Sequence, residues 1–211
     1  GVNGQELHFS QGDAFSTNIV KDIWPGFNNS SNPQWLTKLG SEMVFVADNG
    51  ENGRELWITD STEEGTRMIK DINPGNNSSD PTGPMKEMDG YIYFSANDGV
   101  HGYELWRTDG TEAGTSMVKD INPGENNSLS WGSTAHWHGE YTLVHNGHFY
   151  FSSNDGERGE ELWRTDGTEA GTELIVDVNN GEVGSWPWYL TAMGDKVYFT
   201  AWDGDQRQLW H

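Results

Sequence analysis

An internal repeat is the feature that most constrains what this chain can fold into. Residues 104–115, Glu-Leu-Trp-Arg-Thr-Asp-Gly-Thr-Glu-Ala-Gly-Thr, recur without a change at 161–172, and a close copy spans 55–66. A degenerate copy begins at Glu6, and a truncated one stands at 208–210. The leucine of the motif occupies positions 7, 56, 105, 162 and 209, so successive copies are 49, 49, 57 and 47 residues apart. A period of this length is typical of propeller blades.

Each unit is expected to consist of four short strands. Aromatic and β-branched residues alternate with polar ones between clusters of Gly, Asn, Asp and Pro, which is typical of strands and tight turns. The Glu-Leu-Trp segment is the third strand. The first strands are expected around 35–39, 85, 141–144 and 188–193, the second at 43–46, 91–94, 148–151 and 197–199, and the fourth at 19–23, 68–72, 117–121 and 174–178. No stretch shows a sustained helical period, so the sequence predicts an all-β fold.

The two ends of the chain supply complementary parts of a unit. The N-terminal piece holds strands three and four, and the C-terminal piece holds strands one, two and part of three. We therefore expect one domain over residues 1–211, a four-bladed β-propeller with about 49 residues and four strands per blade, because closing a ring hides edge strands. The closing blade would combine residues 1–23 with about 186–211, and the other repeats would be 24–72, 73–121 and 122–185. One terminal third strand is then redundant.

The repeat resembles a bacterial family named for its Glu-Leu-Trp-x-x-Asp-Gly-Thr (ELWxxDGT) signature. The turn Thr-Asp-Gly-Thr-x-x-Gly-Thr and the following Lys-Asp-Ile-x-Pro-Gly recur in register over essentially the whole chain. A looser likeness to hemopexin-type four-bladed propellers lies in the order of Gly-x-x-Tyr-Phe and x-Leu-Trp-Arg. The first resemblance implies a secreted or cell-surface protein with adhesive or binding roles, and it carries over no catalytic residue. The chain departs from the pattern at His8, Gln11 and Val176, where Trp, Asp and Lys are usual.

Charge and composition exclude several classes of function. Thirty-three acidic residues against twelve basic ones give a net charge of −21, which disfavours nucleic acid and anionic membrane partners. The chain has no cysteine, so it has neither disulfides nor thiolate zinc sites nor cysteine nucleophiles. No apolar run is long enough to predict a membrane span.

Residues that recur in every copy are interpreted as structural. The motif tryptophans are expected to pack between blades, since large rings dominate core energetics. The turn aspartates are expected to accept nearby backbone N–H groups. The motif tryptophans are Trp57, Trp106, Trp163 and Trp210, and the turn aspartates are Asp60, Asp109 and Asp166. The Asn-Asn-Ser triplets that begin at Asn28, Asn76 and Asn126 are formal glycosylation acceptors, for which a role in turns is the preferred interpretation.

The loops between the second and third strands are acidic and contain glycine. Their aspartates are Asp48, Asp98, Asp155 and Asp203. Such loops offer the carboxylate and carbonyl oxygens that calcium prefers, although none follows the twelve-residue helix-flanked calcium loop. Tight turns with solvated charge are the preferred interpretation, and calcium is the alternative.

One repeat carries an insert that duplication does not explain. The linker from Ile121 to Leu143 is 22 residues long, against 12 or 13 in the other units, and the additional residues fall within 130–139. Loops on a rigid scaffold carry function. The tryptophans expected to lie on this face and to contact a ligand are Trp131, Trp137, Trp35, Trp186 and Trp188. Their rings would stack on sugars, so the sequence predicts an extracellular lectin-like module that binds a glycan or a cell-surface polysaccharide.

Three alternatives to carbohydrate binding stay open. A copper or zinc site would use histidines in and after the insert, since two imidazoles at i and i+2 on a strand point to one side. These histidines are His136, His138, His145 and His148. A glycoside-active enzyme would use paired carboxylates, but no nucleophile motif or phosphate loop is present, and we expect no enzyme activity. An insert that merely covers a channel mouth is the third alternative.

Overall fold

The computed structural model describes residues 4–12, 16–129 and 141–211. These residues form seventeen strands and no helix, which confirms the predicted all-β fold. A helix long and apolar enough to cross a bilayer is accordingly not found in this part of the chain.

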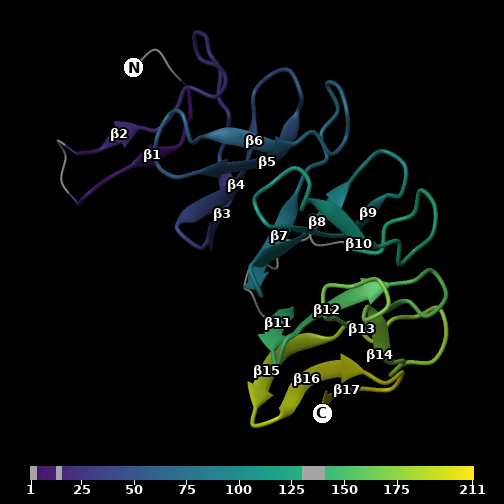
Figure 1. The fold of residues 1–211 in the computed structure, drawn as a ribbon. Coiled ribbons are helices and arrows are strands. Elements are labelled where there is room, and N and C mark those ends of the chain that lie inside the picture. The colour runs from purple at the N-terminus through teal and green to yellow at the C-terminus, as the bar shows by residue number, and fades with distance from the viewer. Residues whose placement is uncertain (1–3, 13–15, 130–140) are drawn as a thin grey trace.

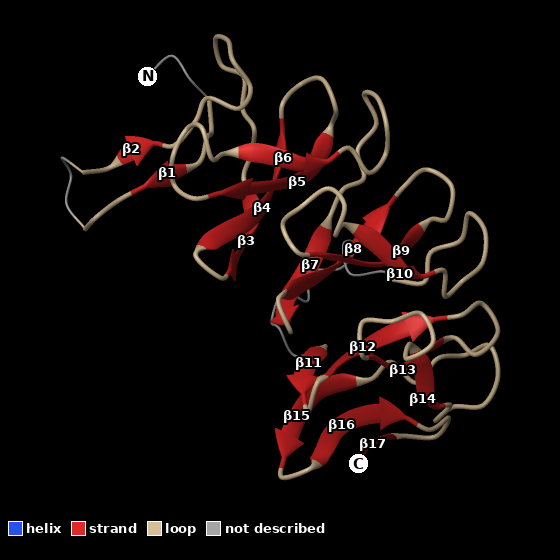
Figure 2. Cartoon of the chain, viewed as in Figure 1, coloured by secondary structure: helices blue, strands red, loops and turns tan. Residues whose placement is uncertain are grey.

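The strands form antiparallel sheets that follow one another along the chain (Figure 2). The first sheet pairs β1 (His8–Phe9) with β2 (Asn18–Ile19). Three four-stranded sheets follow: β3 (Gln34–Leu39), β4 (Glu42–Asp48), β5 (Arg54–Thr59) and β6 (Arg67–Lys70); β7 (Thr82–Met88), β8 (Tyr91–Asn97), β9 (Tyr103–Thr108) and β10 (Ser116–Lys119); β11 (Thr142–His145), β12 (His148–Asn154), β13 (Glu160–Thr165) and β14 (Glu173–Val176). The last sheet has β15 (Trp188–Met193), β16 (Lys196–Trp202) and β17 (Arg207–Trp210).

The sheets lie side by side along an arc that runs from the N-terminus to the C-terminus (Figure 1). The first strand of each of the last four sheets lies on the concave side, where β3 contacts β7, and β11 contacts both β7 and β15. Each of these sheets is a meander from the inner strand to the outer strand, which is the arrangement of propeller blades. The fold is therefore propeller-like.

The closing blade expected from the two ends of the chain is not seen among the described residues. β1 and β2 pair only with each other, and β15–β17 form a separate sheet at the opposite end of the arc (Figure 1). The expectation that 1–23 and 186–211 share one sheet is thus not met in this structure. The physical reason is that pairing within a sheet is local, whereas closure depends on the angle between packed sheets. The number of blades in a closed ring stays a prediction.

The motif tryptophans pack between neighbouring sheets, as predicted. Trp106 of the third sheet lies in one apolar cluster with Leu56 and Ile58 of the second. Trp163 likewise packs with Leu105 of the preceding sheet. These tryptophans are 6% exposed, so each ring removes a large apolar area from water at the boundary between two sheets.

The acidic turn after the motif strand is also built as predicted. Asp109 Oδ1 accepts hydrogen bonds from the backbone N–H of Thr111 at 2.9 Å and from its hydroxyl at 2.6 Å. These bonds hold the pKa of the Asp109 carboxyl below its usual range. A Cβ on Gly114 would lie 2.0 Å from this oxygen, which explains why the turn requires glycine there. Asp60 and Asp166 make the same bonds in their own turns.

A lysine of the fourth strand adds a polar contact between sheets. Lys70 Nζ donates to the carbonyl of Thr115 in the next sheet at 2.9 Å, and Lys119 Nζ donates to that of Thr172 at 2.8 Å. Val176 stands at this position in the following copy and offers no such donor.

Replacing a motif tryptophan tests the packing between sheets. Trp106→Ala should lower the free energy of unfolding by about 3–5 kcal/mol, because it opens a cavity between two sheets. Trp186→Ala, which removes a ring that is 41% exposed, should cost less than about 1 kcal/mol. Urea unfolding followed by circular dichroism measures both. Equal losses in the two variants would contradict the assignment.

Candidate functional site

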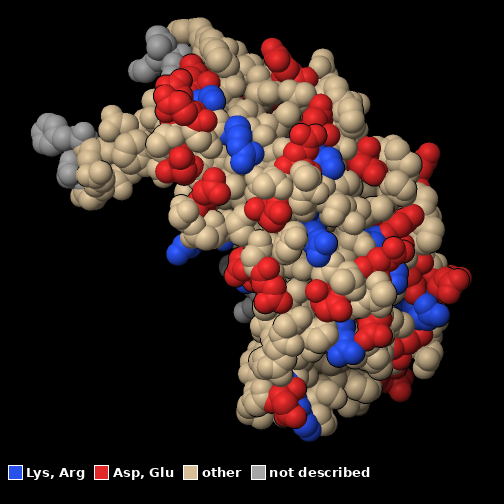
Figure 3. Space-filling model, in the orientation of Figure 1, with Lys and Arg blue, Asp and Glu red and all other residues tan. Residues whose placement is uncertain are grey.

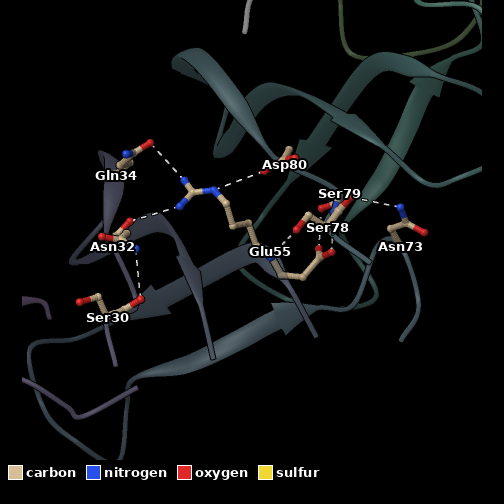
Figure 4. Close-up of polar contacts among 9 residues, drawn as sticks. Ser30, Asn32, Gln34, Glu55, Asn73, Ser78, Ser79 and Asp80 are labelled. Carbon is tan, nitrogen blue, oxygen red and sulfur yellow. Dashed lines mark hydrogen bonds and ion pairs between the residues drawn. The ribbon is translucent and has the colours of Figure 1, made fainter. Parts of the chain in front are cut away.

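A buried glutamate at the start of the motif fastens the linker that leads to the next sheet. Glu55 accepts hydrogen bonds from the backbone N–H of Ser79 at 2.9 Å and from the Ser79 hydroxyl at 2.6 Å (Figure 4). It also accepts the backbone N–H of Ile72 at 3.1 Å. The Ser79 carbonyl accepts the N–H of Asn97, at the end of β8 in the next sheet, at 3.0 Å. One carboxylate thus fixes the end of β6, the linker and the neighbouring sheet.

The same bonds recur in the other copies. Glu6 and Glu161 bind Ser31 and Ser185 in this way, and Glu104 binds the hydroxyl of Ser128, whose backbone N–H donates instead to the Tyr103 carbonyl. The sequence analysis gave this glutamate no role. Two signals could have indicated it, namely a charged residue inside a strand of apolar residues and a serine 24 or 25 positions later in each copy.

Burial changes the protonation of these glutamates. It raises the pKa of the Glu55 and Glu104 carboxyls to about 7 and also raises that of Glu161, while the hydrogen bonds from serine and backbone act in the opposite direction. A buried carboxylate is costly unless donors replace its water, and here three donors do so.

The residue that follows the glutamate-bound serine differs between copies. Asn32, Asp80 and Trp186 all occupy this position with φ between 42° and 47°, a region that bulky residues rarely adopt. The backbone there favours Asn or Asp, so a tryptophan is not explained by local conformation. An outlier of this kind supports a functional hypothesis. Two residues further on, Gln34 of the second sheet corresponds to Trp188 of the last.

An arginine at the start of the motif strand holds this linker in the second sheet. The Arg54 guanidinium donates to the Asn32 carbonyl at 3.5 Å and to the Gln34 side-chain oxygen at 3.1 Å (Figure 4). Its Nε lies 3.3 Å from the carboxylate of Asp80 in the next linker. All the partners of this arginine are polar.

The last sheet keeps the arginine and exchanges the polar partners for aromatic ones. Arg207 donates to the Trp186 carbonyl at 2.9 Å, and its guanidinium carbon lies 4.2 Å from the centroid of the Trp188 ring. The Trp188 ring makes edge-to-face contacts with Tyr141 at 5.9 Å and with Tyr189 at 6.5 Å. We call Tyr141, Trp186, Trp188, Tyr189 and Arg207 the aromatic site. Trp186 and Tyr189 are 41% and 54% exposed, so this site reaches the surface.

The aromatic site lies where β11 and β15 adjoin on the concave side of the arc (Figure 1). Tyr141 directly follows the insert in the sequence. Arg207 contacts both the Trp186 carbonyl and the Trp188 ring, so two of the tryptophans predicted to bind a ligand lie in one site. Trp131, Trp137, His136 and His138 lie outside the described residues.

Glu160, at the start of β13, bonds to the aromatic site through its backbone, and sequence reasoning missed it. The Glu160 carbonyl accepts the N–H of Trp186 at 3.1 Å, which places the start of β13 beside the tryptophan linker. Its carboxyl accepts a hydrogen bond from the Ser152 hydroxyl at 2.8 Å, and burial raises its pKa. The sequence signal for Glu160 was that the residue before the motif glutamate differs between copies, since Arg54 and Tyr103 occupy this position elsewhere.

Trp35 is placed elsewhere. It is half-buried on β3 and packs with the cluster that contains Met85. A Cβ on Gly83 would lie 2.9 Å from its ring, so Trp35 fills the space between β3 and β7. Because β3 and β15 belong to different ends of the arc, Trp35 does not join the aromatic site (Figure 1).

The aspartates of the acidic loops are used by the loops themselves. Oδ1 of Asp98, of Asp155 and of Asp203 each accepts two backbone N–H groups from its own loop, and Asp48 accepts that of Gly50. Bonds from Gln206 and Asp205 lower the pKa of Asp203. The four loops belong to four sheets, and the described residues contain no group of three His, Asp or Glu that could hold a metal ion. Calcium stays a prediction.

Two of the four histidines predicted to bind copper or zinc are described. His145 and His148 are opposite each other across the tight turn of β11 and β12. His148 Nδ1 lies 3.0 Å from the Asn146 carbonyl. This turn uses positive φ at Asn146 and Gly147, which is the hairpin type that Asn-Gly favours.

Comparisons with known proteins give similarity of fold only. No family model and no curated protein matches the chain. Among solved structures it is similar to a puromycin hydrolase, with 19% identity and a TM-score of 0.46 over 90% of this chain and 27% of that one. It is also similar to a prolyl endopeptidase, with 12% identity and a TM-score of 0.49 over 99% of this chain and 30% of that one. A third similar structure is GH43B from a Bacteroides ovatus xyloglucan locus, with 18% identity and a TM-score of 0.40 over 84% of this chain and 37% of that one. The chain spans less than a third of the first two, and at these identities and TM-scores no activity is assigned.

The pH dependence of unfolding tests the buried glutamates. Unfolded glutamate has an ordinary pKa of 4.5, so between about pH 4.5 and 7 the folded protein binds more protons than the unfolded chain. The contribution of the buried glutamates to the free energy of unfolding is complete below pH 4.5 and is lost as the pH rises through about 7. We expect the melting temperature to fall from about pH 5 to about pH 8.

Paired variants separate this effect from general charge repulsion. Glu104→Gln should flatten the pH dependence of the melting temperature, because it removes one titrating group from the interior. Glu112→Gln, at an exposed position of the adjoining turn, should leave the slope unchanged. Calorimetric scans across this pH range measure the slope, and equal slopes in both variants would refute the assignment.

Proposed function

We propose that this protein is a non-catalytic, lectin-like binding module of a secreted or cell-surface protein, and that the aromatic site binds carbohydrate. The observation that carries the proposal is the exchange of polar linker residues for Trp186 and Trp188 on an otherwise repeated scaffold. Repetition explains the scaffold but does not explain two tryptophans at positions that are Asn and Gln in another copy.

The chemistry of the aromatic site suits a neutral polar ligand. Ring faces of tryptophan and tyrosine offer apolar area to the faces of sugar rings, and the polar edges of the same site orient the hydroxyls. Arg207 supplies donors beside the Trp188 ring. Asp and Glu side chains are spread over the face seen in Figure 3, which supports an uncharged rather than a polyanionic ligand.

The insert extends this proposal. Trp131 and Trp137 precede Tyr141 in the sequence and are proposed to add stacking rings to the same ligand. A calcium ion bound by the acidic loops would stabilise the scaffold by mass action without taking part in recognition.

Alanine variants on a glycan array test the proposed function. Trp186→Ala should weaken glycan binding by about 1–3 kcal/mol, or roughly 5- to 150-fold in Kd, by analogy with stacking of bases on aromatic side chains. Phe27→Ala, which removes a still more exposed ring in the first linker, should leave the affinity unchanged. Titration of the array hit by calorimetry gives the two values. Equal affinity in both variants, or release of sugar products, would overturn the proposal.

A further inference from the structure

Three hydroxyl groups are buried between the third and fourth sheets without a hydrogen-bond partner in the described part of the chain. They are Oγ1 of Thr82, Oγ of Ser95 and Oγ1 of Thr142. Ser95 is fully buried, and Thr142 is 3% exposed. Because a buried hydroxyl that makes no hydrogen bond costs free energy, each of these groups requires an explanation.

All three hydroxyls belong to two sheet faces that pack against each other. Thr82 of β7 and Ser95 of β8 are directly opposite in the ladder, so their side chains project from the same face. Tyr93 lies two residues before Ser95, hence on the same face, and its ring packs on the fourth sheet. Thr142 of β11 is opposite Phe151, which belongs to the same apolar cluster as Tyr93. We call these three side chains, at the boundary between the third and fourth sheets, the hydroxyl site.

The boundary between the second and third sheets carries apolar side chains at the same positions. Val46 corresponds to Ser95, because each is directly opposite the motif leucine of its sheet. Met85 corresponds to Thr142, because each lies three residues before the end of its inner strand. Val46 and Met85 are buried in one apolar cluster. Hydroxyls weaken an apolar boundary, so packing between sheets does not explain the exchange.

The third sheet also lacks the ring that fills the preceding boundary. Trp35 of β3 packs between β3 and β7, whereas Gly83 stands at its position in β7, directly after Thr82. In addition, β11 has four residues, while the inner strands β3, β7 and β15 have six or seven. Fewer apolar contacts therefore oppose a separation of β7 from β11.

The fourth sheet shows why Ser95 has no partner within its own sheet. Ser152 occupies the position of Ser95 and donates its hydroxyl to the Glu160 carboxyl at 2.8 Å. Tyr103 stands at the position of Glu160 in the third sheet and offers no carboxyl group. A partner for Ser95 therefore has to come from outside its sheet.

Hydroxyl groups select a particular kind of partner. A Ser or Thr hydroxyl donates one hydrogen bond and accepts others, so its best partner is a group that also does both. The hydroxyl groups of a sugar have this property, and they bring no charge that would have to be compensated inside the protein. Tyr141 of the aromatic site contacts Trp188 and directly precedes Thr142, so the two sites adjoin at the start of β11.

We propose that the hydroxyl site is a second sugar subsite, which opens when β7 and β11 separate and which receives the sugar residue next to the one at the aromatic site. This inference rests on the proposed function. β7 and β11 are in contact on the concave side of the arc, so the opening faces the same side as the aromatic site (Figure 1). Sugar hydroxyls supply the hydrogen bonds that the three side chains lack in the closed boundary, and this difference favours the open state.

Cysteine labelling tests the opening without any sugar. The chain has no cysteine, so Ser95→Cys introduces a single thiol at a fully buried position. Ala96→Cys is the matched control, because Ala96 is also fully buried on β8 but packs with the second sheet. A maleimide should label Ser95→Cys at least about tenfold faster than Ala96→Cys, since only the first boundary opens. Equal labelling rates in the two folded variants would overturn the proposal.

A valine variant tests the hydrogen bonds to the sugar. Thr142→Val removes an unpartnered hydroxyl from apolar surroundings, so it should raise the melting temperature of the sugar-free protein. In calorimetric titrations it should weaken binding of cellotetraose roughly fivefold, as expected for the loss of one hydrogen bond, and leave binding of glucose unchanged. The control Thr37→Val removes a hydroxyl that donates to the Trp35 carbonyl at 3.0 Å. It should not raise the melting temperature, and it should leave both affinities unchanged.

The outcomes separate this inference from the proposed function. If Trp186→Ala weakens binding of both sugars while Thr142→Val weakens neither, carbohydrate binds at the aromatic site alone and the second subsite is refuted. A lowered melting temperature of Thr142→Val would also refute it, because the hydroxyl would then have a partner in the closed protein. Failure of the unaltered chain to bind cellotetraose more tightly than glucose would overturn the subsite, while the glycan array would still decide the proposed function.

Discussion

The buried glutamate of the motif is the interaction on which the arrangement of sheets depends. Each sheet is a local meander, and the linker joins it to the next sheet together with the tryptophan packing and the lysine hydrogen bonds. Glu55 binds the end of one sheet through Ile72 and the linker through Ser79, whose carbonyl bonds to the following sheet. A carboxylate removed from water is stable only with such donors. The same residue therefore stabilises the arc and fixes its geometry.

A linker that is fixed through its backbone leaves its neighbouring side chains free to vary. Asn32, Asp80 and Trp186 have nearly the same φ, and the serine before each donates its backbone N–H to the motif glutamate. The repeat thus tolerates an aromatic pair in one copy without any change in the scaffold. Trp186 and Trp188 use this freedom, and Arg207 keeps the contact that Arg54 makes with the linker carbonyl.

The sequence by itself determined the features that depend on local pattern. The alternation of apolar and polar residues predicted the all-β fold, and Asp109 was assigned to its turn from its neighbours in the chain. The repeat of the motif predicted that Trp106 packs between sheets. Trp186 and Trp188 were also singled out from the sequence, and their contact with a ligand stays a prediction. Only the tertiary structure showed the arc instead of a shared closing blade, because packing between sheets sets their angle. The role of Glu104 likewise depends on contacts 17 and 24 residues away, which the alternation of residues within one strand does not encode.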